Sequence, residues 1–285
     1  MERALMIMLL VALSSCVTNP PTEVTNKSGN ISKYEVIEAQ IPVTYYGTVD
    51  GVYLGYQIAP HNVALKARES FYSYFKKKNK SDLERGIFLT EWLISNATSH
   101  GNFVVWEYSY EWPPYNLSRG WTGSLAQAGC LKAIMLAYQA TGDKRYLEFA
   151  EKALAAFEVE VSQGGLLVLR KENNKSYYWY PEYAKESPPF VLNGFITALI
   201  WLEEYHNTIK NPLAGELYGE GIKSLIHYLP SYDCGEGCSY YDTLQHKASK
   251  HYHKMHVEQM LSLYKLTGDI VFLEYHEKWK KEPEK

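Results

Sequence analysis

Residues 141–152 read TGDKRYLEFAEK, and residues 267–278 read TGDIVFLEYHEK. The two segments share the pattern Thr-Gly-Asp-x-x-aromatic-Leu-Glu-aromatic-x-Glu-Lys, and each follows an apolar run with a tyrosine near its end. Glycine commonly ends a helix, and aspartate commonly caps the start of the next one. The repeat therefore predicts a helix, a tight stop and a second helix, twice in the chain.

Two weaker copies of this pattern lie elsewhere in the sequence. Residues 81–93 (SDLERGIFLTEWL) contain a candidate helix cap at Asp82, and residues 211–225 (NPLAGELYGEGIKSL) contain one at about Asn211. With Asp143 and Asp269, the four caps are spaced by 61, 68 and 58 residues. A supersecondary unit that recurs at such a period is typical of repeat architectures.

The pattern predicts eight helices that form four helical hairpins. We expect them at residues 62–78, 82–97, 122–140, 144–159, 189–208, 213–228, 254–266 and 270–281. Segments of β character separate the pairs at 101–110, 165–180 and 232–241, and residues 41–57 predict a β-hairpin with a Val-Asp-Gly turn. The expected fold is all-α dominated: an α/α toroid, as an incomplete barrel of about four helical hairpins, with short β segments and an N-terminal β-hairpin.

The first residues resemble an export signal. The chain begins MERALMIMLLVALSSC, where Arg3 precedes an apolar run that is too short to span a membrane as a helix. Small residues directly before Cys16 predict a lipoprotein signal in which that cysteine is acylated, and a signal peptide cleaved near Ser15 is the alternative. We expect a signal peptide with a lipobox at 1–16, a flexible tether at 17–40 and the folded domain at 41–285. The protein would be exported, either held at the membrane through lipid on Cys16 or secreted.

Composition narrows the class of ligand. The formal net charge of −3 argues against a general nucleic-acid-binding surface. The chain contains 25 tyrosines and 7 tryptophans, and flat rings with a polar edge suit carbohydrate binding. A core and surface that are simply rich in tyrosine remain the alternative.

The cysteines predict one disulfide bond. Cys234 and Cys238 flank Gly-Glu-Gly, a spacing that suggests a small disulfide loop in an exported chain. Zinc is the alternative because histidines follow at 251, 253 and 256, although this spacing matches no standard zinc finger. Cys130 lies in an apolar helical run and is expected to be a buried free thiol.

Several motifs together resemble a known family. Residues 179–195 read WYPEYAKESPPFVLNGF and are similar to the corresponding stretch of the D-glucuronyl C5-epimerases of heparan sulfate biosynthesis. Tyr241-Asp242 and the later series Tyr252-His253-x-x-His256-Val257-x-Gln259 resemble the C-terminal domain of that family in their order. The resemblance covers roughly residues 100–281 and extends more weakly to 50–75.

The resemblance implies conversion of D-glucuronic acid to L-iduronic acid within a polymer. The hydrogen at C5 lies next to a carboxylate, so its removal needs a base on one face, an acid on the other and neutralisation of the developing charge. Tyrosine can serve both proton roles if its surroundings shift its pKa from about 10. The resemblance implies catalytic roles for Glu182, Tyr183, Tyr241 and Tyr252, with no cofactor and no metal.

The resemblance also implies substrate contacts and shows one departure. The implied contacts are Trp121, Gln127, Asn193, His253 and His256, and metal ligation by the two histidines is the alternative for that pair. The family places Leu-Arg-His after the Tyr-Asp pair, whereas Gln245 stands at the arginine here. We therefore expect His246, Lys247 or Lys250 to meet the substrate carboxylate, with Arg119 as the next candidate.

These observations predict a C5-epimerase-like isomerase that acts on a uronic-acid-containing polysaccharide such as a heparan sulfate-like glycan. A polysaccharide lyase is the first alternative, because it begins with the same proton abstraction. A non-catalytic glycan-binding module is the second, because of the missing arginine. A homodimer is left open.

Overall fold

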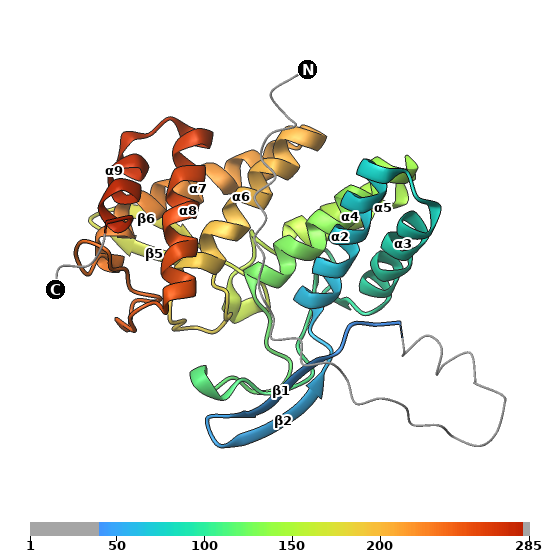
Figure 1. The fold of residues 1–285 in the computed structure, drawn as a ribbon, viewed down its shortest axis with the longest axis horizontal. Coiled ribbons are helices and arrows are strands. Elements are labelled where there is room, and N and C mark those ends of the chain that lie inside the picture. Colours follow the sequence, from blue (N-terminus) through green and yellow to red (C-terminus); the bar gives the residue numbers. More distant parts are fainter. Residues whose placement is uncertain (1–39, 282–285) are drawn as a thin grey trace.

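The computed structural model describes residues 40–281, so Cys16, the signal peptide and the tether up to residue 39 lie outside the described residues. Within the described part, eight α-helices follow one another along the chain (Figure 1). Their bounds are α2 Pro60–Lys77, α3 Lys80–Ser95, α4 Ser124–Thr141, α5 Arg145–Ala155, α6 Leu192–Ile209, α7 Pro212–Tyr228, α8 Lys250–Thr267 and α9 Ile270–Trp279. The predicted helix-rich toroid is confirmed.

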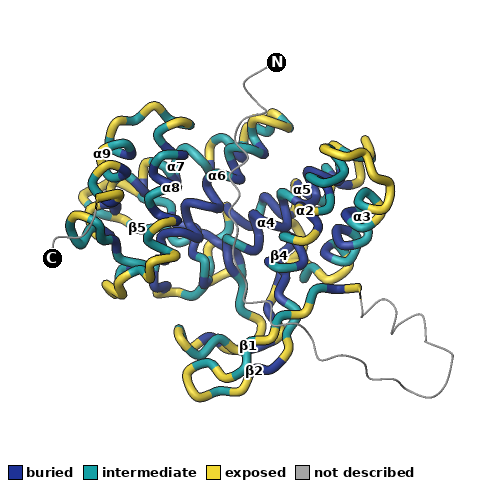
Figure 2. The backbone as a smooth tube through the Cα atoms, viewed as in Figure 1, coloured by how far each residue is buried: buried dark blue, intermediate teal, exposed yellow. Residues whose placement is uncertain are grey.

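The helices pack as four hairpins, which are α2 with α3, α4 with α5, α6 with α7, and α8 with α9. The first members of the pairs also contact one another in succession: α2 packs on α4, α4 on α6, and α6 on α8. These four helices form the inner row of an incomplete barrel. The central pair, α4 and α6, is buried over most of its length (Figure 2), as expected for helices that are apolar on most sides.

Local chemistry explains where the helices begin and end. Gly142 and Gly268 adopt left-handed conformations after α4 and α8, so the repeated Thr-Gly-Asp segment is a helix stop. Asp269 caps α9 through the backbone N–H of Val271, at 3.0 Å. Asp143 accepts the N–H of Arg145 at 3.0 Å, although α5 itself begins only at Arg145.

The prediction of a cap at Asp82 is wrong, while the cap at Asn211 is confirmed. Helix α3 begins at Lys80, and its N-cap is Asn79, which accepts the N–H of Ser81. Asp82 lies in the first turn and accepts a hydrogen bond from the Ser73 hydroxyl at 2.7 Å. Asn211 caps α7 through the N–H of Ala214 at 3.1 Å.

The strands are short and lie between the helix pairs. Strand β1 (Thr44–Val49) pairs with β2 (Val52–Gln57), and Asp50 and Gly51 at the turn both have positive φ, as the predicted hairpin requires. The other pairs are β3 (Thr98–Ser99) with β4 (Val104–Val105) and β5 (Val168–Glu172) with β6 (Lys175–Trp179). Residues 232–241 form isolated bridges in place of the expected strand.

The segments that precede the inner helices meet at one end of the barrel. The backbone N–H of Leu192, at the start of α6, donates to the carbonyl of Tyr241, and Thr243 donates to Pro189. The β1–β2 hairpin packs at the same end through the contact of Tyr46 with Tyr110. The connecting segments therefore form a shared surface at the N-terminal ends of the inner helices.

Both cysteine predictions that fall on described residues are confirmed. Cys234 and Cys238 form a disulfide bond, and Cys130 is a buried free thiol on α4. Among the helices of residues 40–281, none has the length and apolar character needed to cross a membrane.

Replacement of the α9 cap should measurably weaken the last hairpin. Asp269→Ala leaves the N–H of Val271 without its partner, so we expect the free energy of unfolding to fall by about 1 kcal/mol. Asp269→Asn, which can also cap the helix, should keep most of the free energy of unfolding that Asp269→Ala loses. Urea denaturation followed by circular dichroism measures the change, and Glu274→Ala, an exposed acidic site on the same helix, is the control. A loss of equal size in the control would show that the effect is not capping.

Candidate active site

Glu182, Tyr183, Tyr241 and Tyr252 converge from three segments of the chain. The first two lie in the loop between β6 and α6, Tyr241 lies in the loop before α8, and Tyr252 lies in the first turn of α8. The rings of Tyr241 and Tyr252 have centroids 4.7 Å apart, and the Tyr183 side chain interacts with both Glu182 and Tyr241. The four side chains that the resemblance implied therefore form one cluster.

An aromatic wall borders this cluster. The Tyr183 ring lies 4.7 Å from Tyr115 and 5.6 Å from Trp121, measured between ring centroids, and it is parallel to Trp112 at 6.4 Å. Trp121 in turn stacks on Tyr108 at 3.7 Å. Trp121 was predicted as a substrate contact, and its half-buried ring lies among these aromatic side chains at the edge of the cluster. The sequence reasoning did not single out Trp112 and Tyr115, although both lie in the aromatic-rich stretch 106–121.

Two glycines position the Glu182 loop. A β-carbon at Gly123 would lie 1.8 Å from the Glu182 carbonyl oxygen, and one at Gly194 would lie 2.1 Å from Glu182 Oε2. The loop is fixed on both sides of Glu182, because Ser124 N–H donates to Pro181 O and Ala184 N–H donates to Thr122 O, both at 2.9 Å. Glu182 thus lies directly against the first turns of α4 and α6, where a larger residue would displace it.

The electrostatic environment of Glu182 suits proton transfer. Its Oε2 is buried and makes no hydrogen bond within residues 40–281. Burial raises the pKa of this carboxyl to about 7, and the Tyr183 side chain opposes the rise. A group whose pKa lies near neutrality can both accept and return a proton at physiological pH.

The three tyrosines are held in the neutral form. Burial raises the pKa of Tyr183 and of Tyr241 well above the usual value, and Glu182 adds to both effects. Burial is also the main cause of the raised pKa of Tyr252, followed by the charge of Glu182. At neutral pH these hydroxyls are therefore proton donors, and Glu182 is the member of the cluster that changes its charge.

A buried carboxylate supports the loop that carries Tyr241. Asp242 is fully buried and accepts hydrogen bonds from the Tyr115 hydroxyl and from His246 Nδ1, both at 2.8 Å. It also accepts the backbone N–H of Leu244 at 3.0 Å. His246 was predicted to meet the substrate carboxylate. Its side chain is 64% exposed, but it is already paired with Asp242.

The structure places Gln127 and His256 in the core, so it does not support the prediction that they contact the substrate. Gln127 is 1% exposed, and its amide donates to the carbonyls of Val104 and Ala153 at 2.8 Å. His256 is 0% exposed, with its Nδ1 2.8 Å from the Ser239 hydroxyl. Both side chains are held by partners within the protein and are part of its core.

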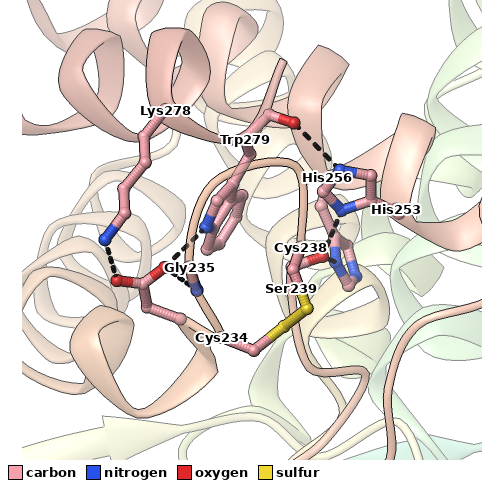
Figure 3. The surroundings of a disulfide bond; sticks show 9 residues. Cys234, Gly235, Cys238, Ser239, His253, His256, Lys278 and Trp279 are labelled. Carbon is pink, nitrogen blue, oxygen red and sulfur yellow. Dashed lines mark hydrogen bonds and ion pairs between the residues drawn. A yellow bond between two sulfur atoms is a disulfide. The ribbon is translucent and has the colours of Figure 1, made fainter. Parts of the chain in front are cut away.

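His253 also has a structural setting (Figure 3). Its Nδ1 lies 2.8 Å from the Ser239 hydroxyl, and its Nε2 lies 2.9 Å from the carbonyl oxygen of Trp279. The two histidines and Ser239 join α8 to the disulfide loop and to α9. Both ring nitrogens of His253 are engaged, which does not support the prediction of a free donor to a sugar hydroxyl.

Lys247 and Lys250 line a different pocket, of about 510 Å³, together with the disulfide loop and His253. Both lysines are exposed, as is Arg119. The structure therefore does not bring the predicted cations into the tyrosine cluster, and their role toward a carboxylate stays a prediction. No group of three or more His, Cys, Asp or Glu side chains in the described part of the chain is placed to hold a metal ion.

Asn193, the remaining predicted contact, lies in the first turn of α6 beside Gly194. It is 3% exposed and borders a small cavity between the inner helices, with its side-chain oxygen unpaired within the described range. Of the predicted substrate contacts, Trp121 and Asn193 are therefore the two that adjoin the Glu182 loop.

Sequence comparisons identify relatives over most of the chain. Residues 100–281 match a family model described as "D-glucuronyl C5-epimerase C-terminus". An uncharacterized protein of Methanocaldococcus jannaschii is 52% identical over 265 residues, covering 88% of this chain and 86% of that protein. The D-glucuronyl C5-epimerase of Caenorhabditis elegans is 30% identical over 208 residues, covering 66% of this chain but only 33% of that enzyme.

Structural comparisons show the same fold in sugar-processing enzymes. Cellobiose 2-epimerase from Spirochaeta thermophila matches with a TM-score of 0.53 and 17% identity, over 77% of this chain and 57% of that one. A family 76 glycoside hydrolase (mannosidase) from Bacteroides thetaiotaomicron matches with a TM-score of 0.51 and 12% identity, over 79% and 62% respectively. The chain thus spans less than two thirds of these solved structures, and at such identities the similarity shows the fold alone.

The burial of Glu182 predicts a pH dependence of stability. Its pKa is about 7 in the folded protein and about 4.3 in an unfolded chain, so folding favours the protonated form. The resulting stability is fully present below the unfolded pKa and is lost as pH rises through about 7, up to a total of about 3 kcal/mol.

Glu182→Gln keeps the size of the side chain and removes the titration. The native protein should lose stability between pH 4.5 and pH 7.5, and the variant should not. We therefore expect the variant to become more stable relative to the native protein as pH rises, as measured by urea denaturation. Glu186→Gln, at an exposed site in the same loop, is the control. A constant difference across this range would show that Glu182 does not have a raised pKa.

Proposed function

The chain belongs to the D-glucuronyl C5-epimerase family, and from this premise we propose that it inverts C5 of glucuronic acid residues in a polysaccharide by proton transfer on both faces of the sugar. Its family relationship supports sugar epimerisation in general. What we propose beyond this is that the substrate is a glucuronyl residue and that inversion proceeds by proton transfer. The observation that carries it is the convergence of Glu182, Tyr183, Tyr241 and Tyr252 at the end of the barrel where the connecting segments meet.

Glu182 is the proposed base. A carboxylate with a pKa near 7 is half ionised at neutral pH, and its buried, unpaired oxygen is more reactive toward a proton than a hydrated carboxylate. It takes the C5 hydrogen as a proton, and the electron pair of the C–H bond moves into the adjacent carboxylate to give an enediolate. Gly123 and Gly194 keep the base in one position during this step.

Tyr252 is the proposed acid. Its raised pKa keeps the hydroxyl protonated, and it is more exposed than Tyr183, so a polymer can approach it. It gives its proton to the opposite face of C5, which closes the C–H bond with inverted geometry. The ring of Tyr241 lies beside the phenolate that forms on Tyr252, with 4.7 Å between the two ring centroids. Tyr252 then regains a proton from solvent, and Glu182 releases its proton to solvent.

The aromatic wall would hold the sugar ring. Trp112, Tyr115, Trp121 and Tyr183 present flat faces of the kind that stack on pyranose rings. The polymer would lie across the end of the barrel formed by the connecting segments. We propose further that the protein is exported and held at the membrane through lipid on Cys16, a residue outside the described part of the chain.

The native protein should exchange the C5 hydrogen of polymeric glucuronate with solvent. Incubation of several glucuronate polymers in deuterated water, followed by NMR at C5, measures the exchange. Glu182→Gln and Tyr252→Phe should each slow it by about 10²- to 10⁴-fold, because each removes a proton-transfer group. Tyr264→Phe, about three turns further along the same helix, is the matched control.

A product with ultraviolet absorption and no label at C5 would contradict epimerisation and indicate a lyase instead. Binding without exchange in every polymer would indicate a glycan-binding module.

Chelation should leave this activity unchanged. The proposed chemistry uses only side-chain carboxyl and hydroxyl groups, so dialysis against EDTA should preserve the exchange rate. Elemental analysis of the purified protein gives the complementary measurement. A stoichiometric metal whose removal abolishes exchange and whose return restores it would contradict the proposed roles of Glu182 and Tyr252.

A further inference from the structure

A small cavity lies between the four inner helices, with a volume of about 20 Å³. Its polar walls are His61 and Arg68 from α2 and Asn193 and Thr197 from α6, and its apolar walls include Trp201 and Met255. This volume accommodates a group about the size of a water molecule. The cavity can therefore take one end of a ligand, but not a whole sugar ring.

Arg68 brings an unneutralised charge to this cavity. It is 5% exposed, and its Nε donates to the carbonyl of Ala64 at 3.2 Å. Its guanidinium lies 4.1 Å from the centre of the Trp201 ring. The acidic Glu204 on the neighbouring α6 is already paired with Lys132 at 2.5 Å, and no described carboxylate forms an ion pair with Arg68. A buried cation without a counter-charge costs several kcal/mol, so the site favours an anion.

Two further groups facing the cavity lack partners. Both ring nitrogens of His61 and the side-chain oxygen of Asn193 are buried and unpaired among residues 40–281. Burial and the nearby Arg68 lower the pKa of His61 to about 3, against a smaller opposing effect of the Leu125 backbone, which lies near the ring without forming a hydrogen bond of good geometry. The neutral ring offers one donor and one acceptor. Buried polar groups are nearly always hydrogen-bonded, and several unpaired ones around one cavity indicate a missing ligand group.

The cavity lies directly beside the Glu182 cluster. Asn193 immediately precedes Gly194, against which the Glu182 carboxylate packs, and Met255 is three residues after Tyr252 on α8. Tyr108 lies between the two regions: burial is the main cause of its raised pKa, followed by the charges of Tyr46, Cys130 and Glu182, and the backbone of His61 opposes the rise. Asn193 and Met255 therefore connect the cavity to the segments that carry Glu182 and Tyr252.

We propose that Arg68 pairs with the carboxylate of the uronate residue whose C5 lies at the tyrosine cluster, with the His61 ring donating to that carboxylate and the Asn193 oxygen accepting from a neighbouring sugar hydroxyl. The proposal rests on the proposed function and names the residue that neutralises its substrate. Arg68 thereby supplies, from helix α2, the charge that is absent at Gln245, an exposed loop residue with positive φ. The developing enediolate is stabilised by this cation.

The mixed polarity of the walls favours a sugar acid over a simple halide. A halide would pair with Arg68 but would leave the Asn193 oxygen without a donor. A sugar acid carries its carboxylate next to ring oxygen and hydroxyl groups, so one ligand can satisfy both the cation and the acceptor. The carboxylate would enter the cavity while the ring stays at the aromatic wall.

The test compares a glucuronate oligosaccharide with its uncharged methyl ester, using calorimetric binding and C5 exchange on the full chain. The native protein should prefer the acid by about tenfold or more, since charge-assisted hydrogen bonds are strong. Arg68→Met, which keeps the apolar stem, should bind acid and ester equally and should slow exchange by about a hundred-fold. Arg145→Met, which removes an exposed arginine on α5, is the control for net charge.

Asn193→Asp provides a second variant in case Arg68→Met does not fold, as judged by circular dichroism. It places a carboxylate beside Arg68 within the protein, so it should abolish the acid preference with the guanidinium still present. Retention of the acid preference in either folded variant would overturn the proposal, while leaving the epimerase function in place if exchange continues.

The experiment distinguishes failure of the proposed function from failure of the Arg68 proposal, because C5 exchange and acid preference are measured separately. A native protein that shows no exchange, but whose acid preference is lost in Arg68→Met, would contradict epimerisation and support the carboxylate site. Thermal stabilisation by chloride that is lost in Arg68→Met, without any acid preference, would overturn the proposal in favour of a halide site.

Discussion

The close approach of the Glu182 loop to two helix ends is the constraint on which the site depends. Gly123 and Gly194 have no side chain, so the carbonyl and the carboxylate of Glu182 can lie against the first turns of the two central inner helices. The hydrogen bonds of Ser124 and Ala184 hold the loop in that position. Because α4 and α6 are buried over most of their length, Glu182 is held against the buried core of the barrel.

The same burial creates the electrostatic character of the site. Glu182 loses its hydration, so its pKa rises to about 7, and the tyrosines around it are kept protonated for the same reason. Arg68, enclosed between α2 and Trp201, forms no ion pair with a described carboxylate, and Glu204 and Glu69 act on its charge only from a longer distance. Groups held in such unfavourable surroundings reduce stability, and functional sites commonly keep them because ligand binding relieves the cost.

Sequence reasoning succeeded where the signal was local or was carried by a matching motif. The helix stops at Gly142 and Gly268 and the cap at Asp269 were predictable because left-handed glycine and capping aspartate act within a few residues. Asp82 was misassigned because Asn79, three residues earlier, offers the same capping chemistry. Gln127 and His256 belong to matching motifs, but a motif does not show whether a side chain lies in a cleft or in the core.

The sequence by itself determined the four helical hairpins, their stops and the identity of the residues that form the tyrosine cluster. Only the tertiary structure decided which of these residues lose contact with water, and therefore which groups change their pKa. It also placed Arg68 at the cavity between the inner helices and Tyr115 beside Tyr183, residues that no local pattern distinguished from ordinary helix and loop positions. Desolvation and charge pairing arise from contacts between segments far apart in the chain, and the order of residues along one segment cannot specify them.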